Sequence, residues 1–160
     1  MNLPNGVDIN NLIADLKKFS WEASEILLYY SKKLEDSNFK NEIINKTDLN
    51  QPVTVADLKV NDLIKKRIKE FYPDVCWDFL SEEDSKLEGK LFNPKYDWLW
   101  VLDPLDGTKD FIQGTGNYAM HLSLNFKNKP VLGVVLIPER NELWMSYSSK
   151  TYCFKDGISE

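Results

Sequence analysis

The stretch "WLWVLDPLDGTKDF", residues 98–111, constrains the fold and the function more than any other part of the sequence. Its first five residues are apolar, which is typical of a buried β-strand, and the run leads directly into Asp103. Asp106 follows three residues later, before Gly107 and Thr108. Two carboxylates this close repel each other, and burying either one without a partner costs free energy. A fold that keeps both must therefore offer them a compensating interaction.

The composition indicates one globular domain over residues 1–160 that is not suited to bind nucleic acid. Hydrophobic residues make up 42% of the chain and charged residues 28%, which is ordinary for a folded domain. The formal net charge of −5 argues against a nucleic-acid partner, because such binding requires a basic surface. No apolar run approaches the roughly 20 residues that cross a bilayer, so no membrane partner is expected. The N-terminus lacks the basic and apolar regions of a signal peptide, and we expect a cytoplasmic protein.

Histidine and cysteine side chains contribute little to the predicted chemistry. The single histidine, His121, lies in the strand-like run "NYAMHLSLNF" and is expected to be a packed or edge-strand residue rather than a catalytic base. Cys76 and Cys153 are far apart in the sequence and outside any metal-ligand spacing, so we expect two buried, reduced thiols. The chemistry must therefore come from oxygen-bearing side chains.

Two amphipathic helices are predicted in the first half of the chain. Apolar residues recur every three or four positions over residues 7–33, with Asp8 as the expected N-cap. A second helix is predicted over residues 54–71, before Pro73. The residues expected to be buried on the second helix are Val55, Leu58, Leu63, Ile64 and Ile68.

The rest of the chain reads mainly as β-strands, with short links that suit antiparallel turns. A strand is expected over residues 39–46, followed by a turn over 47–52, and a short helix is expected at "GTKDFI". Short strands are also expected at "DVCWDFLS" and "YDWLWVLD". The later predicted strands cover residues 117–126, 129–138, 141–148 and 151–157. Two helices and a mostly antiparallel sheet predict a layered α+β fold.

Oxygen ligands gather at the ends of these predicted elements, at Asp57, Glu82–Glu83, Asp103 and Asp106–Thr108. Each has an ordinary structural explanation: Asp57 suits a capping box, "SEED" a solvated loop and "DPLDG" a turn. Taken together, they favour a metal site. A turn through Pro104 and Leu105 is expected to return Asp106 beside Asp103, and Mg²⁺ prefers carboxylate and carbonyl oxygens.

The residues after Asp106 extend this hypothesis to a phosphate ligand. Gly107 is expected to let a phosphate approach the backbone closely, and the helix that starts at Thr108 would present free N–H groups to that anion. The Thr108 hydroxyl is placed to position a water molecule. A metal cluster, an anion-binding helix start and no histidine base predict metal-assisted hydrolysis of a phosphate ester.

Three motifs resemble those of a known family. "DPLDGTKDF" resembles the DP-[IL]-DGT motif of the inositol monophosphatase family of Mg²⁺-dependent sugar and nucleotide phosphatases. "PVTVAD" resembles the T-x-A-D element of that family and "LSEE" its [GS]-E-E element, in the same order and spacing. The likeness covers about residues 8–158. It implies the N-terminal half of the family's fold, which binds metal and phosphate.

The resemblance also implies roles for individual residues. Glu82 would bind metal and help hold the nucleophilic water, while Asp103, Asp106 and the Leu105 carbonyl would complete the metal shell. Asp57 would accept a hydrogen bond from Thr108, whose hydroxyl orients the water.

Asp106, Gly107 and Thr108 would contact the substrate phosphate, and water would attack in line without a covalent intermediate. Glu83, Lys46 and Asp48 rank below these residues.

Within the family, "DGTKDF" is most similar to the CysQ-type 3′(2′),5′-bisphosphate nucleotidases. The implied substrate is a small phosphorylated metabolite, 3′-phosphoadenosine 5′-phosphate, a by-product of sulfate assimilation. Inositol or sugar monophosphates remain an alternative, as does a non-catalytic metal- or phosphate-binding module or truncated relic.

The family's C-terminal domain carries a W-D-x-A motif whose aspartate completes the metal site, and that motif does not occur in these 160 residues. We therefore expect low activity from this chain alone, unless a second copy or a complementing chain supplies the ligand.

Overall fold

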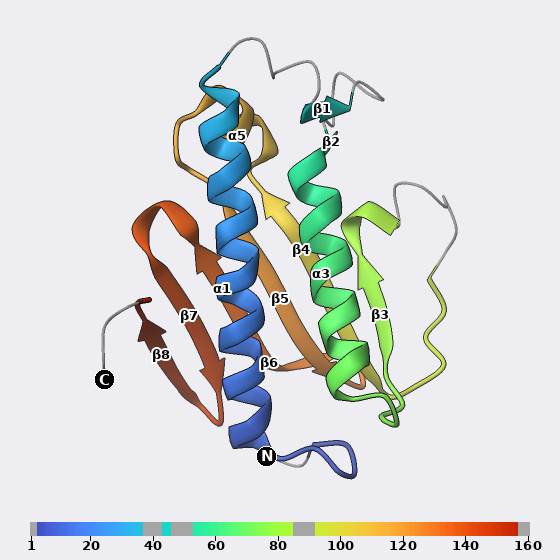
Figure 1. Cartoon of the computed structure of the whole chain (residues 1–160). Coiled ribbons are helices and arrows are strands. Elements are labelled where there is room, and N and C mark those ends of the chain that lie inside the picture. The colour runs from blue at the N-terminus through green and yellow to red at the C-terminus, as the bar shows by residue number, and fades with distance from the viewer. Residues whose placement is uncertain (1–2, 37–42, 46–52, 85–91, 157–160) are drawn as a thin grey trace.

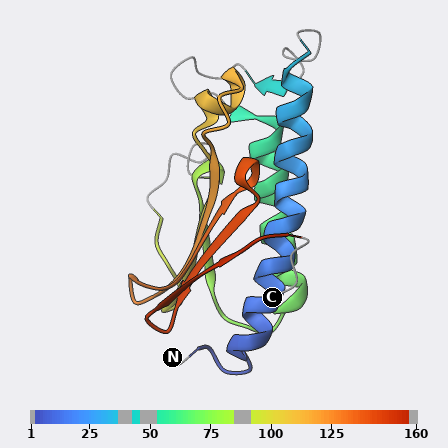
Figure 2. The ribbon, with the colours of Figure 1, turned by 90° about the vertical axis from the view of Figure 1, so that its left-hand side faces the viewer.

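Two long helices lie side by side on one face of a six-stranded sheet in the computed structural model (Figures 1 and 2). The structure describes residues 3–36, 43–45, 53–84 and 92–156. The helices are α1 (Ile9–Leu34), α3 (Val55–Phe71) and the short α5 (Thr108–Gln113). The sheet strands are β3 (Asp78–Ser81), β4 (Trp98–Asp106), β5 (Ala119–Phe126), β6 (Lys129–Ile137), β7 (Glu142–Tyr147) and β8 (Lys150–Phe154).

Other described elements include two short strands and one 3₁₀ helix. Strands β1 (Ile44–Asn45) and β2 (Val53–Thr54) pair antiparallel, and the 3₁₀ helix η1 (Pro138–Arg140) links β6 to β7. Most of the strand predicted over residues 39–46, and the whole turn predicted over 47–52, lie outside the described residues.

Both long helices begin where the sequence predicts, because each start is fixed by a local side-chain cap. The Asp8 carboxylate accepts hydrogen bonds from the backbone N–H groups of Asn10 (2.9 Å) and Asn11 (3.0 Å). Helix α3 starts with a capping box in which Thr54 and Asp57 each bond to the backbone of the other. These caps satisfy N–H groups that would otherwise lack a partner.

The buried side of α3 differs in part from the predicted one. Ile64 and Ile68 are buried as expected, whereas Val55, Leu58 and Leu63 are only half-buried. The face that meets α1 and the sheet is instead formed by Ala56, Val60, Ile64 and Ile68, at intervals of four residues. The bulkier Leu58 and Leu63 flank that stripe, and Leu63 faces the outer side of the helix pair.

The sheet order is β3-β4-β5-β6-β7-β8, and every neighbouring pair is antiparallel except β3 and β4, which are parallel. The predicted α+β class with a mostly antiparallel sheet is therefore confirmed. Alternate side chains along β4 to β7, such as Trp100, Leu122 and Met145, point into one core shared with both long helices. The opposite face of the sheet carries no helix of the described chain (Figure 2).

Two expectations were wrong, and the open face explains the exposure of His121 and Cys153. His121 lies on β5, a central strand, and its side chain is 45% exposed, so it is neither an edge residue nor a packed one. Cys76 and Cys153 are both exposed rather than buried. Cys153 pairs with Trp144 in the register of β7 and β8, and Trp144 is 41% exposed in the row of residues that includes His121.

None of the helices in the described ranges is both long and apolar enough to cross a membrane.

Candidate active site

Asp103 and Glu82 meet because the only parallel strand pair of the described sheet ends there. In the register of β3 and β4, Ser81 pairs with Leu102, so Glu82 follows the end of β3 at the level where Asp103 continues β4. The carboxyl ends of parallel strands lie at the same edge of a sheet, which brings the two side chains together. Asp103 is half-buried and Glu82 is exposed.

The contact between these carboxyl groups perturbs the pKa of Asp103 strongly. Burial raises this pKa from 3.8 to about 7, with further upward contributions from the charge of Glu82, a hydrogen bond with Glu82 and the charge of Asp106. The backbone N–H of Leu105 donates to Asp103 Oδ1 at 3.2 Å and opposes the shift. The site thus holds more negative charge than its own partners can compensate.

A β-bulge, rather than the predicted turn, places Asp106 beside this pair. Asp103 pairs with His121 and Asp106 pairs with Ala119, so three steps along β4 match two steps along β5. The extra residue puts Asp103 and Asp106 on the same face of the sheet, although regular alternation would separate them. Pro104 and Leu105 are both buried, which holds this segment against the core as strand and excludes an exposed turn.

Asp57 links the start of α3 to the start of α5. Its Oδ2 atom accepts hydrogen bonds from the Thr54 backbone N–H (2.8 Å) and from the Thr54 hydroxyl (2.5 Å). Thr108 Oγ1 lies 3.4 Å from Asp57 Oδ1 and 3.0 Å from the Leu105 carbonyl oxygen. Burial raises the pKa of Asp57 to about 6, against the lowering effect of the Thr54 hydrogen bonds. Asp57 therefore forms the capping box and contacts Thr108 at the same time.

Gly107 is required by the fold at this point, whatever its role toward a ligand. Its φ angle is 85°, in the left-handed region that favours glycine. A Cβ atom built on it would lie 2.6 Å from the Asn117 carbonyl oxygen and 3.3 Å from the Tyr118 Cα. The backbone can thus turn from β4 into α5 only because this residue has no side chain.

The remaining predicted residues lie elsewhere or outside the described ranges. Glu83 is 2% exposed, and its charge contributes to the raised pKa of Asp57. Glu83 therefore faces the side of Asp57, while Glu82 faces Asp103. Lys46 and Asp48 are not among the described residues.

Residues that the sequence did not single out border Asp106. A cavity of about 250 Å³ beside it is lined by Arg140, Asn117, Tyr118 and Ala119, among others. His121 Nδ1 lies 3.9 Å from Asp106 Oδ2. The sequence gives no sign of these contacts, since they depend on the register of three strands.

The oxygen atoms of the carboxylate side chains at this site are of the kind that binds a divalent cation. The described residues nevertheless do not form a complete coordination shell. Neighbouring carboxylates that repel each other, one of them half-buried, are groups whose charge a hard cation neutralises. Within the described ranges, however, no three His, Cys, Asp or Glu side chains are arranged as a metal-binding group. A complete shell would need backbone oxygens, water or residues beyond those described.

Two solved structures, one named as an IMPase and the other as an extragenic suppressor protein, share the fold of this chain. The IMPase of Thermotoga maritima superposes with a TM-score of 0.66 at 25% identity, covering 94% of this chain and 52% of its own. The SuhB protein of Bartonella henselae superposes with a TM-score of 0.70 at 20% identity, covering 92% and 52%. At 20% identity the second similarity shows the fold alone.

The chain belongs to the inositol monophosphatase family, whose model matches residues 9–159. It is 34% identical to the 3′(2′),5′-bisphosphate nucleotidase CysQ of Escherichia coli K12 over 117 residues, which are 73% of this chain and 46% of that protein. It is also 37% identical to the Nus factor SuhB of Pasteurella multocida over 95 residues, 59% of this chain and 33% of that protein. The sequence motifs predicted both the family and the similarity to CysQ, and both predictions are confirmed. The chain spans less than half the length of these curated relatives.

Proposed function

We propose that this chain is the metal- and phosphate-binding part of a Mg²⁺-dependent phosphomonoester hydrolase that acts on bisphosphate nucleotides such as 3′-phosphoadenosine 5′-phosphate. The proposal includes a cytoplasmic location and a role in sulfur metabolism. The similarity to CysQ proteins, at 34% and 38% identity for those of Escherichia coli and Haemophilus influenzae, supports the substrate class.

The observation that carries the proposal is the carboxylate pair at the end of the parallel strands. Asp103 is half-buried against Glu82 and shares a sheet face with Asp106, and its pKa of about 7 results first from burial and then from the neighbouring charges of Glu82 and Asp106. A cation bound by these side chains and by the Leu105 carbonyl would offset the repulsion between the carboxylates. Bound Mg²⁺ would supply Lewis-acid activation of water and neutralisation of phosphate charge.

The other residues of the site act on the water and on the phosphate. Thr108 has two acceptors within reach, the Leu105 carbonyl and Asp57, so its hydroxyl can be turned and leave a lone pair for a water molecule. Asp57 holds that hydroxyl in place while it remains anchored to Thr54. The backbone N–H groups of Gly107 and Thr108 would bind the phosphate, next to Asp106.

Two other functions have some support. The similarity to the IMPase of Thermotoga maritima favours an inositol or sugar monophosphate as the substrate. A metal- or phosphate-binding module without turnover is the other alternative, and it would use the same carboxylates and the same turn at Gly107. Both alternatives retain the phosphate ligand and differ in the substrate or in the chemistry.

The test is Mg²⁺-dependent phosphate release by the purified 160-residue chain, with 3′-phosphoadenosine 5′-phosphate and inositol 1-phosphate assayed in parallel. Asp103→Asn is the matched variant, because it keeps the shape of the side chain and removes its charge. Mg²⁺ binding by both proteins is measured calorimetrically in the same buffer, and circular dichroism verifies that both are folded.

Each outcome distinguishes one function. Release from the nucleotide that disappears in Asp103→Asn supports the proposal, and preference for the inositol ester replaces the substrate class. Mg²⁺ binding that depends on Asp103 without release from either ester favours the binding module. A folded chain that neither binds Mg²⁺ nor releases phosphate overturns the proposed site.

A further inference from the structure

The cavity of about 250 Å³ beside Asp106 carries a positive charge that the proposed phosphatase chemistry does not use. One of its walls is the segment over residues 117–119, where β5 begins, and the other includes Ile137 and Arg140 around η1. Among the described residues that line the cavity, Arg140 is the cation. The cavity is several times larger than the volume of one water molecule, about 30 Å³, so it has room for a phosphate group.

The guanidinium group of Arg140 is exposed and has no ion-pair or hydrogen-bond partner in the part of the chain that the structure describes. Asp106 lines the same cavity, but its ion pair within the described residues is with His121, at 3.9 Å between Nδ1 and Oδ2. An arginine that served to neutralise Asp106 would approach its carboxylate to salt-bridge distance. The charge of Arg140 is therefore available to a ligand.

Both neighbours of this arginine in the sequence are held by hydrogen bonds, which fixes the backbone that presents it. Glu139 Oε1 accepts hydrogen bonds from the Tyr118 hydroxyl (2.7 Å) and from the Ser31 hydroxyl (3.2 Å). On the other side, Asn141 Nδ2 donates to the Asp156 backbone carbonyl (3.1 Å), and Asn141 Oδ1 accepts from the Asp156 backbone N–H (3.2 Å). The guanidinium therefore extends from an anchored turn, which reduces the entropy lost when it binds a ligand.

The opposite wall of the cavity is fixed relative to the turn at Gly107. The Thr115 hydroxyl donates to Asp110 Oδ1 at 2.7 Å, and the Asn117 backbone N–H donates to Thr115 Oγ1 at 3.3 Å. The Asn117 carbonyl oxygen lies so close to Gly107 that a Cβ atom built there would be 2.6 Å from it. The cavity is therefore contiguous with the turn whose N–H groups are proposed to bind the scissile phosphate.

We propose that this cavity binds the second, non-scissile phosphate of a bisphosphate substrate, with Arg140 as its cationic contact. The inference rests on the proposed function, because Gly107 and Thr108 are assigned there to the scissile phosphate. Metal ions at the carboxylates would neutralise that phosphate, whereas the second one lies beside Asp106 and needs a cation of its own. A guanidinium matches a phosphate with two parallel hydrogen bonds, which a monophosphate substrate leaves unused.

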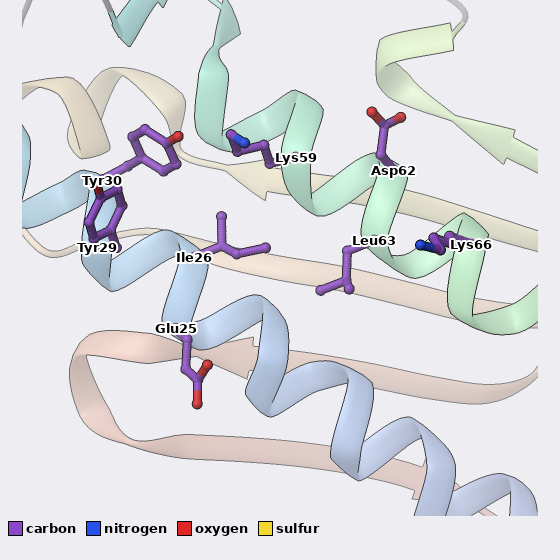
Figure 3. A pocket seen from close by; sticks show the side chains of 8 residues that line it. All are labelled: Glu25, Ile26, Tyr29, Tyr30, Lys59, Asp62, Leu63 and Lys66. Carbon is purple, nitrogen blue, oxygen red and sulfur yellow. The ribbon is translucent and has the colours of Figure 1, made fainter.

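Another hollow with exposed lysines lies on the outer side of the helix pair (Figure 3). Its volume is about 570 Å³, and Lys59 and Lys66 on its rim are balanced by Glu25 and Asp62. It offers no excess of positive charge to a bisphosphate, and Lys66 is nine residues along α3 from Asp57 at the active-site end. Lys66 therefore provides a matched control for Arg140.

The test compares 3′-phosphoadenosine 5′-phosphate with the two adenosine monophosphates that each keep one of its phosphates. Binding is measured calorimetrically with Ca²⁺, which takes the same kind of oxygen ligands as Mg²⁺, and phosphate release is assayed separately with Mg²⁺. Arg140→Gln should weaken binding of the bisphosphate roughly ten- to a hundredfold, because it removes charge-assisted hydrogen bonds. Binding of the tighter monophosphate should stay within about twofold, so the cycle of variants and ligands isolates the contact with the second phosphate.

Two further variants sharpen the comparison. Arg140→Lys should bind the bisphosphate with intermediate affinity, because lysine keeps the charge and lacks the planar fork. Lys66→Gln removes the same charge from the other hollow and should leave all three affinities unchanged. Circular dichroism verifies that every variant is folded.

The outcomes separate this inference from the proposed function. An unchanged affinity for the bisphosphate in Arg140→Gln overturns the inference, even where the natural chain releases phosphate. Equal losses for the bisphosphate and both monophosphates also overturn it, since they place the effect of the arginine on Asp106 or on the metal. A selective loss without phosphate release supports the subsite and contradicts the hydrolase. A folded natural chain that binds none of the three nucleotides overturns both.

Discussion

Replacing Gly107 with alanine should destabilise the chain far more than an ordinary glycine substitution does. The left-handed backbone at φ 85° costs an L-residue roughly 1–2 kcal/mol. The added methyl group would also lie 2.6 Å from a backbone carbonyl oxygen of Asn117, which cannot rotate away as a side chain can. Overpacking of this kind adds roughly 1–3 kcal/mol. We expect a total loss of about 2–5 kcal/mol in the free energy of unfolding.

Gly114 offers a matched control at the other end of the same short helix. Its φ angle is 72°, but a Cβ atom built on it has no heavy atom within 4 Å. Gly114→Ala therefore carries the backbone cost alone, and the difference between the two variants isolates the contact with Asn117. Urea unfolding followed by circular dichroism measures both losses. In thermal unfolding, the midpoint temperature of Gly107→Ala should fall by roughly 4–20 °C.

Equal losses in the two variants would refute this reasoning, because they would mean that the backbone near Gly107 has room for a methyl group. If Gly107→Ala left the free energy of unfolding unchanged, the segment that leads into β5 would not lie close to this turn. The result would also separate two roles of the residue. A large loss without any phosphate present assigns the glycine to the fold before any ligand is considered.

Further predictions concern the carboxylates. Asp57→Ala should lower the free energy of unfolding by about 1 kcal/mol, since the backbone N–H of Thr54 loses its acceptor; Asp57→Asn should lose less, and equal losses would contradict the hydrogen-bond argument. The raised pKa values of Asp103 and Asp57 mean that the folded chain binds more protons, so metal-free stability should fall as pH rises from about 4 to about 7. Added Mg²⁺ should raise the midpoint temperature more at pH 8 than at pH 5.5, and Asp103→Asn should abolish that response; an equal response at both pH values would refute it. Glu82→Gln should lower the pKa of Asp103 toward its ordinary value in a carboxyl NMR titration, and an unchanged titration would exclude their contact.

The sequence predicted those parts of the fold that depend on local interactions. The starts of α1 and α3 were predictable because Asp8 and the Thr54–Asp57 box act within three residues of themselves. The bulge in β4 was not, since "DPLDG" has good turn chemistry and only the core that receives Leu105 keeps it extended. The exposed side of His121 likewise depends on which sheet face the helices cover.

The candidate site, like the fold, was predictable only where it depends on local sequence. Motif spacing identified its carboxylates, but the contact between Glu82 and Asp103 follows from the parallel register of β3 and β4, which no local pattern encodes. Arg140 and Asn117 come beside Asp106 through the order of strands β4, β5 and β6. The set of metal ligands that the motifs imply remains a prediction.

Helix α1 precedes in the sequence the strands on which it packs, and this order has a consequence for synthesis on the ribosome. Its apolar side, which includes Leu12, Leu16 and Phe19, packs on a sheet whose central strands begin only at Trp98. At roughly 5–20 residues per second, the ribosome needs several seconds to supply those strands after α1 is complete. During that interval α3 is the main helical partner within reach. Nascent chains of this protein should therefore expose an amphipathic helix and bind chaperones early, before the sheet that covers it exists.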